Sequence, residues 1–185
     1  MIDTLFQLDG AILLWIQEYV RNDVLTPLFT VVTGLGDKGF IWILLSLVLL
    51  VSRKTRETGV IALLGLFLSL LVINLTLKNV IARVRPFDVI EGLVPLIGHP
   101  GDFSFPSGHS ASSFAAAGVL VRRLPKWAGI PFFLLAVMIS LLRLYVGVHY
   151  PTDVFAGIAI GLGLSYLAEW IWGRRKKPDD GKETI

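Results

Sequence analysis

The sequence predicts an all-α fold, a polytopic bundle of transmembrane helices. The chain of 185 residues is 54% apolar and only 17% charged, and its mean hydropathy is +0.71. A soluble domain carries about a quarter of charged residues, so this composition excludes a disordered chain and an ordinary soluble protein. The chain has no cysteine, which excludes disulfides and thiolate metal sites. A net charge of +3 is too small to indicate a nucleic-acid partner.

Five apolar runs account for the predicted spans. A helix needs about 20 residues to cross the bilayer core, and only the second and fifth runs approach that length unaided. The others must borrow flanking residues or tilt. Helix is the expected state because an open strand leaves its backbone unsatisfied in lipid. The runs cover residues 39–52, 58–77, 107–121, 127–142 and 154–172.

The N-terminal stretch is predicted as two amphipathic pieces. Asp9 and Glu18 interrupt the apolar pattern of residues 4–34, which breaks near 21–23. Helices lying on the outer leaflet fit this pattern better than a sixth span, which stays as the alternative. The first twenty residues hold no Lys or Arg, so no cleavable signal peptide is expected. The predicted division is an N-terminal segment 1–37, a membrane bundle 38–173 and a basic tail 174–185.

Basic residues mark alternate ends of the runs. Clusters follow the first, third and fifth runs, and the positive-inside rule places them in the cytoplasm. The clusters are Arg53, Lys54 and Arg56; Arg122, Arg123 and Lys126; and Arg174, Arg175, Lys176 and Lys177. Apart from Lys182 in the tail, the remaining cations all lie near the outer boundary, against the rule, which indicates an outward-facing anion site. They are Arg21, Lys38, Lys78, Arg83, Arg85 and Arg143.

The first outer cluster closes the second run, where Lys78 precedes Arg85 by seven residues. Seven residues are close to two helical turns, so both side chains are predicted to project from one helix face. Pro86 then ends the helix, with Arg85 in its last turn. Two such cations would clamp a dianion. The alternative is stabilisation of the helix C-terminus, and Arg83, off the shared face, is interpreted in that way.

The second cluster, Pro106-Ser107-Gly108-His109, opens the third run. Small residues at a helix start expose free backbone N–H groups and the positive end of the helix dipole to an anion. Ser107 adds a hydroxyl donor, and Gly108 allows close approach of a ligand. His109 can give or take a proton near neutral pH. A helix-capping Ser followed by an interfacial His is the alternative.

The third cluster joins the fourth run to the fifth and contains Arg143, His149 and Asp153. Pro151 breaks a continuous helix, so His149 is predicted in the turn and Asp153 in the first turn beyond it. A carboxylate there can hydrogen-bond one imidazole nitrogen and turn the other toward a substrate. The alternative is a surface His with a helix-capping Asp.

Two further features are the loop 87–105 and a group of glycines in the fifth run. The loop could form a lid, and Asp102 within it is interpreted as an ordinary loop charge. Gly157 and Gly161, together with Gly163, are predicted to let helices of the same chain pack closely.

In this order, the three clusters resemble the motif set of the type 2 phosphatidic acid phosphatase family of integral membrane lipid phosphatases. The resemblance covers about residues 38–173 and is greatest to small bacterial members that act on undecaprenyl diphosphate or phosphatidylglycerophosphate. One position departs from the family pattern, because Leu142 stands where a Ser usually precedes the Arg of the third motif.

The resemblance implies a metal-independent lipid phosphatase that needs no cofactor. It implies that His149 is the nucleophile and forms a phosphohistidine, that Asp153 orients it, and that His109 protonates the leaving oxygen and then activates water. The phosphate-binding residues that it implies are Lys78, Arg85, Ser107, Gly108 and Arg143. No residue is predicted as a metal ligand, since three cations can replace the metal.

The expected substrate is a phosphorylated membrane lipid: undecaprenyl diphosphate first, then phosphatidylglycerophosphate or phosphatidate. We expect a multi-pass protein of the cell membrane with its active site outside and its basic loops and C-terminus in the cytoplasm. Two alternatives stay open, a lipid phosphotransferase with the same site and a non-catalytic binding or transport bundle. Transporters tend to carry repeats and mid-membrane polar residues, whereas the polar residues here gather at one face. The sequence does not indicate an oligomeric state.

Overall fold

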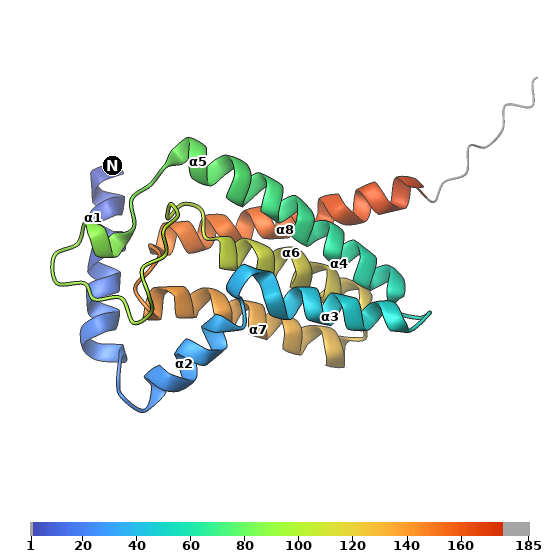
Figure 1. Ribbon diagram of the computed structural model, residues 1–185, viewed down its shortest axis with the longest axis horizontal. Helices are drawn as coiled ribbons and strands as arrows, with labels where there is room; N and C mark the ends of the chain where they lie inside the picture. The colour runs from blue at the N-terminus through green and yellow to red at the C-terminus, as the bar shows by residue number, and fades with distance from the viewer. Residues whose placement is uncertain (1, 176–185) are drawn as a thin grey trace, which may run out of the picture.

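The computed structural model describes residues 2–175, with side chains from residue 4 onward. Most of this part of the chain is helical, and no strand occurs in it. The predicted all-α class is therefore confirmed. Figure 1 shows α4, α6, α7 and α8 side by side along the long axis. The α-helices are α1 (Ile2–Trp15), α2 (Leu25–Gly34), α3 (Phe40–Val51), α4 (Arg56–Ser69), α5 (Lys78–Ile81), α6 (Gly108–Arg123), α7 (Lys126–Tyr145) and α8 (Pro151–Arg175). Shorter π and 3-10 segments are η1 (Ile16–Val20), η2 (Asp37–Gly39), η3 (Leu70–Leu77) and η4 (Pro86–Asp88).

Helix α6 lies in the middle of the bundle and is built largely from Ala, Ser and Gly. Ten of its 16 residues are buried. Neighbouring helices approach its backbone closely: a Cβ atom placed on Gly65 of α4 would lie 3.0 Å from the carbonyl oxygen of Ala115. Small side chains on a central helix therefore allow several helices to pack around it at short distance.

Close packing between α6 and α8 depends on two glycines. A Cβ on Gly157 would lie 2.6 Å from the carbonyl oxygen of Ser107, and one on Gly161 would lie 2.5 Å from that of Ala111. The predicted intrachain role of these two glycines is confirmed. Gly163 does not share it, because nothing lies within 4 Å of a Cβ at that position.

Three helical segments are long and apolar enough to cross a membrane, and a fourth is counted if the bent pair α2 and η2–α3 forms one span. The predicted count of five is not confirmed. Helix α3 qualifies only with α2, from which it is bent by 48°. Helix α6 has 16 residues, fewer than a span needs, and lies inside the bundle. The three segments are Arg56–Asp88, Lys126–Tyr145 and Pro151–Arg175.

The helix that carries Lys78 ends earlier than predicted. Ala82 takes a left-handed conformation with φ 49°, and Arg85 has extended backbone with φ −73° and ψ 152°. The prediction that Arg85 stands on the last turn above Lys78 is therefore wrong. The cause is tertiary, because the chain leaves the helix to pair with the loop before α6, where the Ser104 N–H donates to the Arg83 carbonyl oxygen at 2.8 Å.

The N-terminal stretch forms two helical pieces with a break at residues 21–24, as predicted. Helix α1 crosses one end of the bundle beside the start of α8 (Figure 1). Asp9 of α1 is buried and accepts hydrogen bonds from the Thr152 N–H at 3.1 Å and from Arg83 at 2.9 Å. A buried charge therefore fixes α1 on the bundle. Its position on a leaflet stays a prediction.

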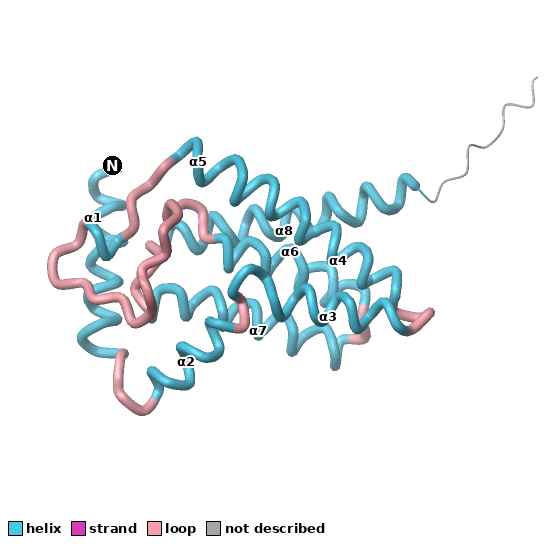
Figure 2. The backbone as a smooth tube through the Cα atoms, in the orientation of Figure 1, coloured by secondary structure: helices cyan, strands magenta, loops and turns pink. Residues whose placement is uncertain are grey.

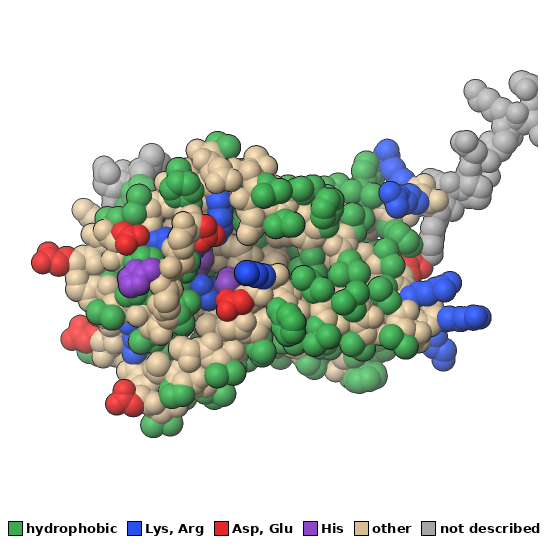
Figure 3. Space-filling model, viewed as in Figure 1, with side chains coloured by type: hydrophobic (Ala, Val, Ile, Leu, Met, Phe, Trp, Pro, Cys, Tyr) green, Lys and Arg blue, Asp and Glu red, His purple; other side chains and the backbone are tan. Residues whose placement is uncertain are grey.

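The two ends of the bundle carry different side chains. Figure 3 shows Lys and Arg side chains projecting at the end where α8 finishes, and the histidines and most visible acidic side chains at the other. The long loop between α5 and α6 folds over this second end (Figure 2). Residues 176–185, the last part of the predicted basic tail, lie outside the described residues.

We expect Gly161→Ala to lower the melting temperature of the protein in detergent. The new methyl group would press on the backbone oxygen of Ala111 and push α8 away from α6, and overpacking of this kind costs about 1–3 kcal/mol. Gly163→Ala on the same helix is the matched control, and because Ala favours helix it should leave the melting temperature unchanged or raised. Equal melting temperatures for Gly161→Ala and the unmodified protein would contradict the close packing of these helices.

Candidate active site

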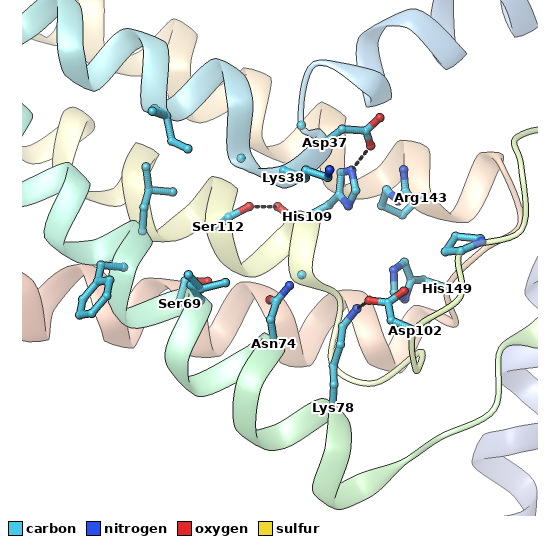
Figure 4. A pocket seen from close by; sticks show the side chains of 18 of the residues that line it. Asp37, Lys38, Ser69, Asn74, Lys78, Asp102, His109, Ser112, Arg143 and His149 are labelled. Atoms are coloured by element: carbon cyan, nitrogen blue, oxygen red, sulfur yellow. Dashed lines mark hydrogen bonds and ion pairs between the residues drawn. The ribbon is translucent and has the colours of Figure 1, made fainter.

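A cavity of about 760 Å³ lies at the end of the bundle that holds the histidines. Its charged part is lined by the two motif histidines and by four cations (Figure 4). These residues are His109, His149, Lys38, Lys78, Arg85 and Arg143. The flank toward the middle of the bundle is apolar and comes from α3, α4 and the start of η3. Its residues are Ile43, Leu63, Leu66, Phe67 and Leu70.

His149 lies in the turn between α7 and α8, and Asp153 lies in the first turn of α8, as the sequence predicts. Both are buried. His149 lines the cavity; its Nδ1 is 3.4 Å from Asp153 Oδ2, and its Nε2 is 3.4 Å from Nη1 of Arg85, another lining residue. One ring nitrogen is therefore held by a carboxylate, and the other is directed to an anion site.

Asp153 is held by three donors besides the histidine. The Tyr150 N–H donates to it at 2.9 Å, the Ser104 hydroxyl at 2.5 Å and Arg83 Nη1 at 2.6 Å. Arg83 also pairs with Asp9 at 2.9 Å. The interpretation of Arg83 as a cation that stabilises a helix end is wrong, because its guanidinium bridges two buried carboxylates. Two features of the sequence point to this pair: Arg83 is predicted near the outer boundary against the positive-inside rule, and Asp9 is a charged residue within an apolar stretch.

Lys78 and Arg85 converge on Asp102 from the loop before α6. Lys78 Nζ pairs with one carboxylate oxygen, and Arg85 Nη2 pairs with the other at 2.6 Å. Both cations are buried, whereas the Asp102 side chain is 51% exposed. Burial alone would raise the pKa of the Asp102 carboxyl, but the two cations lower it to about 2. The interpretation of Asp102 as an ordinary loop charge is wrong.

Arg143 reaches the cavity from the last turn of α7. It is buried, and its Nη1 donates to the Thr33 hydroxyl at 3.1 Å. Its Nε has no partner within residues 4–175. An unpartnered guanidinium donor in a buried position is costly, and a bound anion would satisfy it. Arg143 thus adds a third fixed cation next to Lys78 and Arg85.

The start of α6 supplies His109 and Gly108 to the cavity lining. His109 Nε2 is 2.8 Å from Asp37 Oδ1. Asp37 comes from the turn between α2 and α3, and no motif in the sequence pointed to it. Ser107 does not line the cavity. Its hydroxyl accepts from the Ser110 N–H at 3.4 Å, so it caps α6.

Two imidazoles, each paired with a carboxylate, therefore face one cavity beside fixed cations. Such an arrangement can hold a dianionic phosphoryl group, present a nucleophilic nitrogen to phosphorus and supply a second imidazole for proton transfer.

Comparison with known proteins places this arrangement in a family. Residues 58–177 match the model of the PAP2 superfamily. Undecaprenyl-diphosphatase of Sulfolobus acidocaldarius is 36% identical over 129 residues, which cover 70% of this chain but only 62% of that protein. Phosphatidylglycerophosphatase B of Bacillus subtilis is 35% identical over 166 residues, covering 81% of this chain and 76% of that protein.

The fold agrees with these matches. The crystal structure of a transmembrane PAP2 type phosphatidylglycerolphosphate phosphatase from Bacillus subtilis superposes with a TM-score of 0.77 at 30% identity, covering 95% of this chain and 89% of that one. The segment that matches the family model contains Lys78, His109 and His149. With the family model matching more than half of its length, this chain belongs to the PAP2 superfamily.

Proposed function

We propose that this protein is an integral membrane lipid phosphatase that hydrolyses a phosphomonoester or a diphosphate of a membrane lipid. The observation that carries the proposal is the two-sided cavity, in which a cationic end with two histidines continues into an apolar flank on α3 and α4. A phosphorylated lipid has both parts, a dianionic head for the cations and a tail for the flank. A water-soluble phosphate ester would leave the apolar flank unused.

The first step is attack on phosphorus by Nε2 of His149. A P–N bond forms, the bond between phosphorus and the lipid oxygen breaks, and His109 gives its proton to the departing oxygen. Asp153 keeps the proton on Nδ1 of His149, so that Nε2 has a free lone pair. Lys78, Arg85 and Arg143, with the backbone N–H of Gly108, stabilise the phosphoryl oxygens during transfer. Ser107 is a further candidate donor if its hydroxyl turns from its capping partner.

The second step returns the enzyme to its starting state. His109, now without its proton, takes one from water, whose oxygen attacks the phosphohistidine. The P–N bond breaks and phosphate leaves. Fixed cations supply the charge stabilisation that phosphoryl transfer requires, so we expect hydrolysis to proceed without added metal or cofactor.

Undecaprenyl diphosphate is the favoured substrate, with phosphatidylglycerophosphate and phosphatidate next. The names of the relatives support the first two, since they are an undecaprenyl-diphosphatase and a phosphatidylglycerophosphatase. The active site is proposed to face outward and the basic loops inward. Two of the basic clusters follow α3 and end α6. In support of this orientation, Figure 3 shows Lys and Arg side chains gathered at the end of the bundle away from the histidines.

His149→Ala should abolish phosphate release, because no other group presents a nucleophilic nitrogen held by Asp153. We expect a loss of about 10³-fold or more. The measurement is phosphate release in detergent and EDTA from the three candidate lipids. His99→Ala is the matched control, because that histidine is exposed, packs on Phe87 and does not line the cavity, and it should keep full activity.

The ranking of the three lipids then identifies the substrate class. Phosphate release that requires added metal would contradict the mechanism. A folded protein that releases no phosphate from any of the three lipids would contradict simple hydrolysis and favour the transferase or the binding alternative.

Asp102→Asn should tighten the binding of inorganic phosphate. The carboxylate of Asp102 occupies the two cations that are proposed to hold the phosphoryl group, so it competes with any phosphate that enters. With a pKa of about 2, this carboxylate stays ionised at every working pH. Without this carboxylate, Lys78 and Arg85 are free of their competing partner in a larger fraction of the molecules. We expect this to lower the inhibition constant of phosphate by about tenfold. Glu91→Gln, an exposed change in the same loop, should leave that constant unaltered, and an unaltered constant in Asp102→Asn would contradict the competition.

A further inference from the structure

The turn between α2 and α3 places a fourth cation in the cavity. Lys38 lines the same cavity as His109 and His149, and Figure 4 shows it beside His109, across from Lys78. Its side chain is exposed, and within the described side chains it makes no hydrogen bond or ion pair. Each of the other three lining cations already has a protein partner. The Lys38 ammonium is therefore available to a ligand.

The backbone holds Lys38 at this position in an unusual conformation. Lys38 has φ 53° and ψ 18°, in the left-handed region that side-chain-bearing residues seldom adopt, and Gly39 follows with φ 72°. The turn is also fitted closely to His109: a Cβ on Gly36 would lie 2.9 Å from Cδ2 of that ring, and Asp37 hydrogen-bonds it. A strained residue next to a reactive group is a reason to look for a functional role.

The geometry of the proposed reaction indicates which part of the substrate would lie next to Lys38. In phosphoryl transfer the attacking and leaving atoms are roughly in line with phosphorus. With His149 attacking and His109 protonating, the leaving oxygen is on the His109 side, and the group attached to it comes next to Lys38. In a lipid monophosphate that group is an uncharged carbon. In a lipid diphosphate it is a second, anionic phosphate.

We propose that the turn Asp37–Gly39 is a subsite for the lipid-linked phosphate of a diphosphate, and that Lys38 binds this phosphate as it leaves. The inference rests on the proposed function and deepens it, because it makes lipid diphosphates the preferred substrate class. The terminal phosphorus forms a bond to His149, and the bond from that phosphorus to the bridging oxygen breaks. The bridging oxygen keeps the electron pair and takes the proton of His109, and Lys38 offsets the charge that develops on the departing lipid phosphate.

Charge matching supports this assignment. Lys78 and Arg85, which pair with Asp102, and Arg143 together are sufficient for one phosphoryl group, and of these Arg85 lies beside His149. A second phosphate needs a positive charge of its own, because bringing an anion into a partly apolar cavity without a partner is costly. Lys38 is placed to supply this charge without disturbing the first three.

The test compares two substrates with the same tail, farnesyl diphosphate and farnesyl monophosphate, in detergent with EDTA. The quantity measured is the ratio of kcat/KM for the diphosphate to kcat/KM for the monophosphate. Lys38→Asn removes the charge, and Asn tolerates the left-handed conformation, so the turn should be kept. We expect the ratio to fall by about tenfold or more. Lys38→Gly, which also fits the turn, should give the same fall, and Lys38→Arg should restore most of the ratio.

Lys54→Asn is the control, because this exposed lysine lies in the turn between α3 and α4, at the far end of the bundle (Figure 1). The ratio for this variant should equal that of the unmodified protein. An unchanged ratio in Lys38→Asn and Lys38→Gly, or equal losses on both substrates, would overturn the subsite. Hydrolysis of the monophosphate alone by the unmodified protein would also overturn the subsite while leaving the phosphatase in place. Hydrolysis of neither would reject the proposed function and the subsite with it.

Discussion

The orientation of His149 depends on one guanidinium group, that of Arg83, which lies between the buried carboxylates of Asp9 and Asp153. Arg83 is the cation that both of these buried carboxylates share, so its loss would leave both without their positive partner. Removing one partner of a buried ion pair leaves an unpaired charge and typically costs about 3–5 kcal/mol. Arg83 thus connects α1, the segment after α5 and the first turn of α8, and through Asp153 it fixes the ring of His149.

Contacts from the N-terminal part of the chain support the segments that surround the cavity, although this part carries none of the three motifs. Asp9 of α1 accepts from Thr152, next to Asp153, and Arg21 donates to the carbonyl oxygens of Tyr145 and Val94. The first of these carbonyls is at the end of α7 and the second is in the loop before α6. Helix α1 and the segment after it therefore hold the end of α7, the start of α8 and the covering loop in one arrangement.

Much of this could be predicted from the sequence, because membrane insertion restricts where charge can stand. The outer-face cations stood out as exceptions to the positive-inside rule, and four of them, Lys38, Lys78, Arg85 and Arg143, line the cavity. Periodicity and proline placed His149 in a turn ahead of Asp153. These features could be predicted because they follow from local sequence and from the constraints that a bilayer places on every membrane protein.

What the sequence could not give depends on tertiary contacts of irregular segments. Ala82 ends its helix because the following residues pair with a distant loop, and Asp102 reaches Lys78 and Arg85 across 17 residues or more of chain. Asp37 meets His109 across 72 residues. No periodicity links such positions, so a single sequence identifies the cations but leaves their carboxylate partners unassigned.

The close packing of α6 and α8 holds His109 and His149 in a fixed arrangement, whereas the apolar part of the cavity comes from other elements. The Ser107 N–H donates to the Asp153 carbonyl oxygen at 3.0 Å, and Gly157 keeps the two helix starts in contact. His109 and His149 are thereby mounted on a single frame. The apolar flank comes from other elements, α3, α4 and the start of η3. Phe67 is exposed on this flank, so a change there can alter the apolar surface while the spacing of the two imidazoles is preserved. The apolar lining of the cavity and the arrangement of its histidines can therefore vary independently.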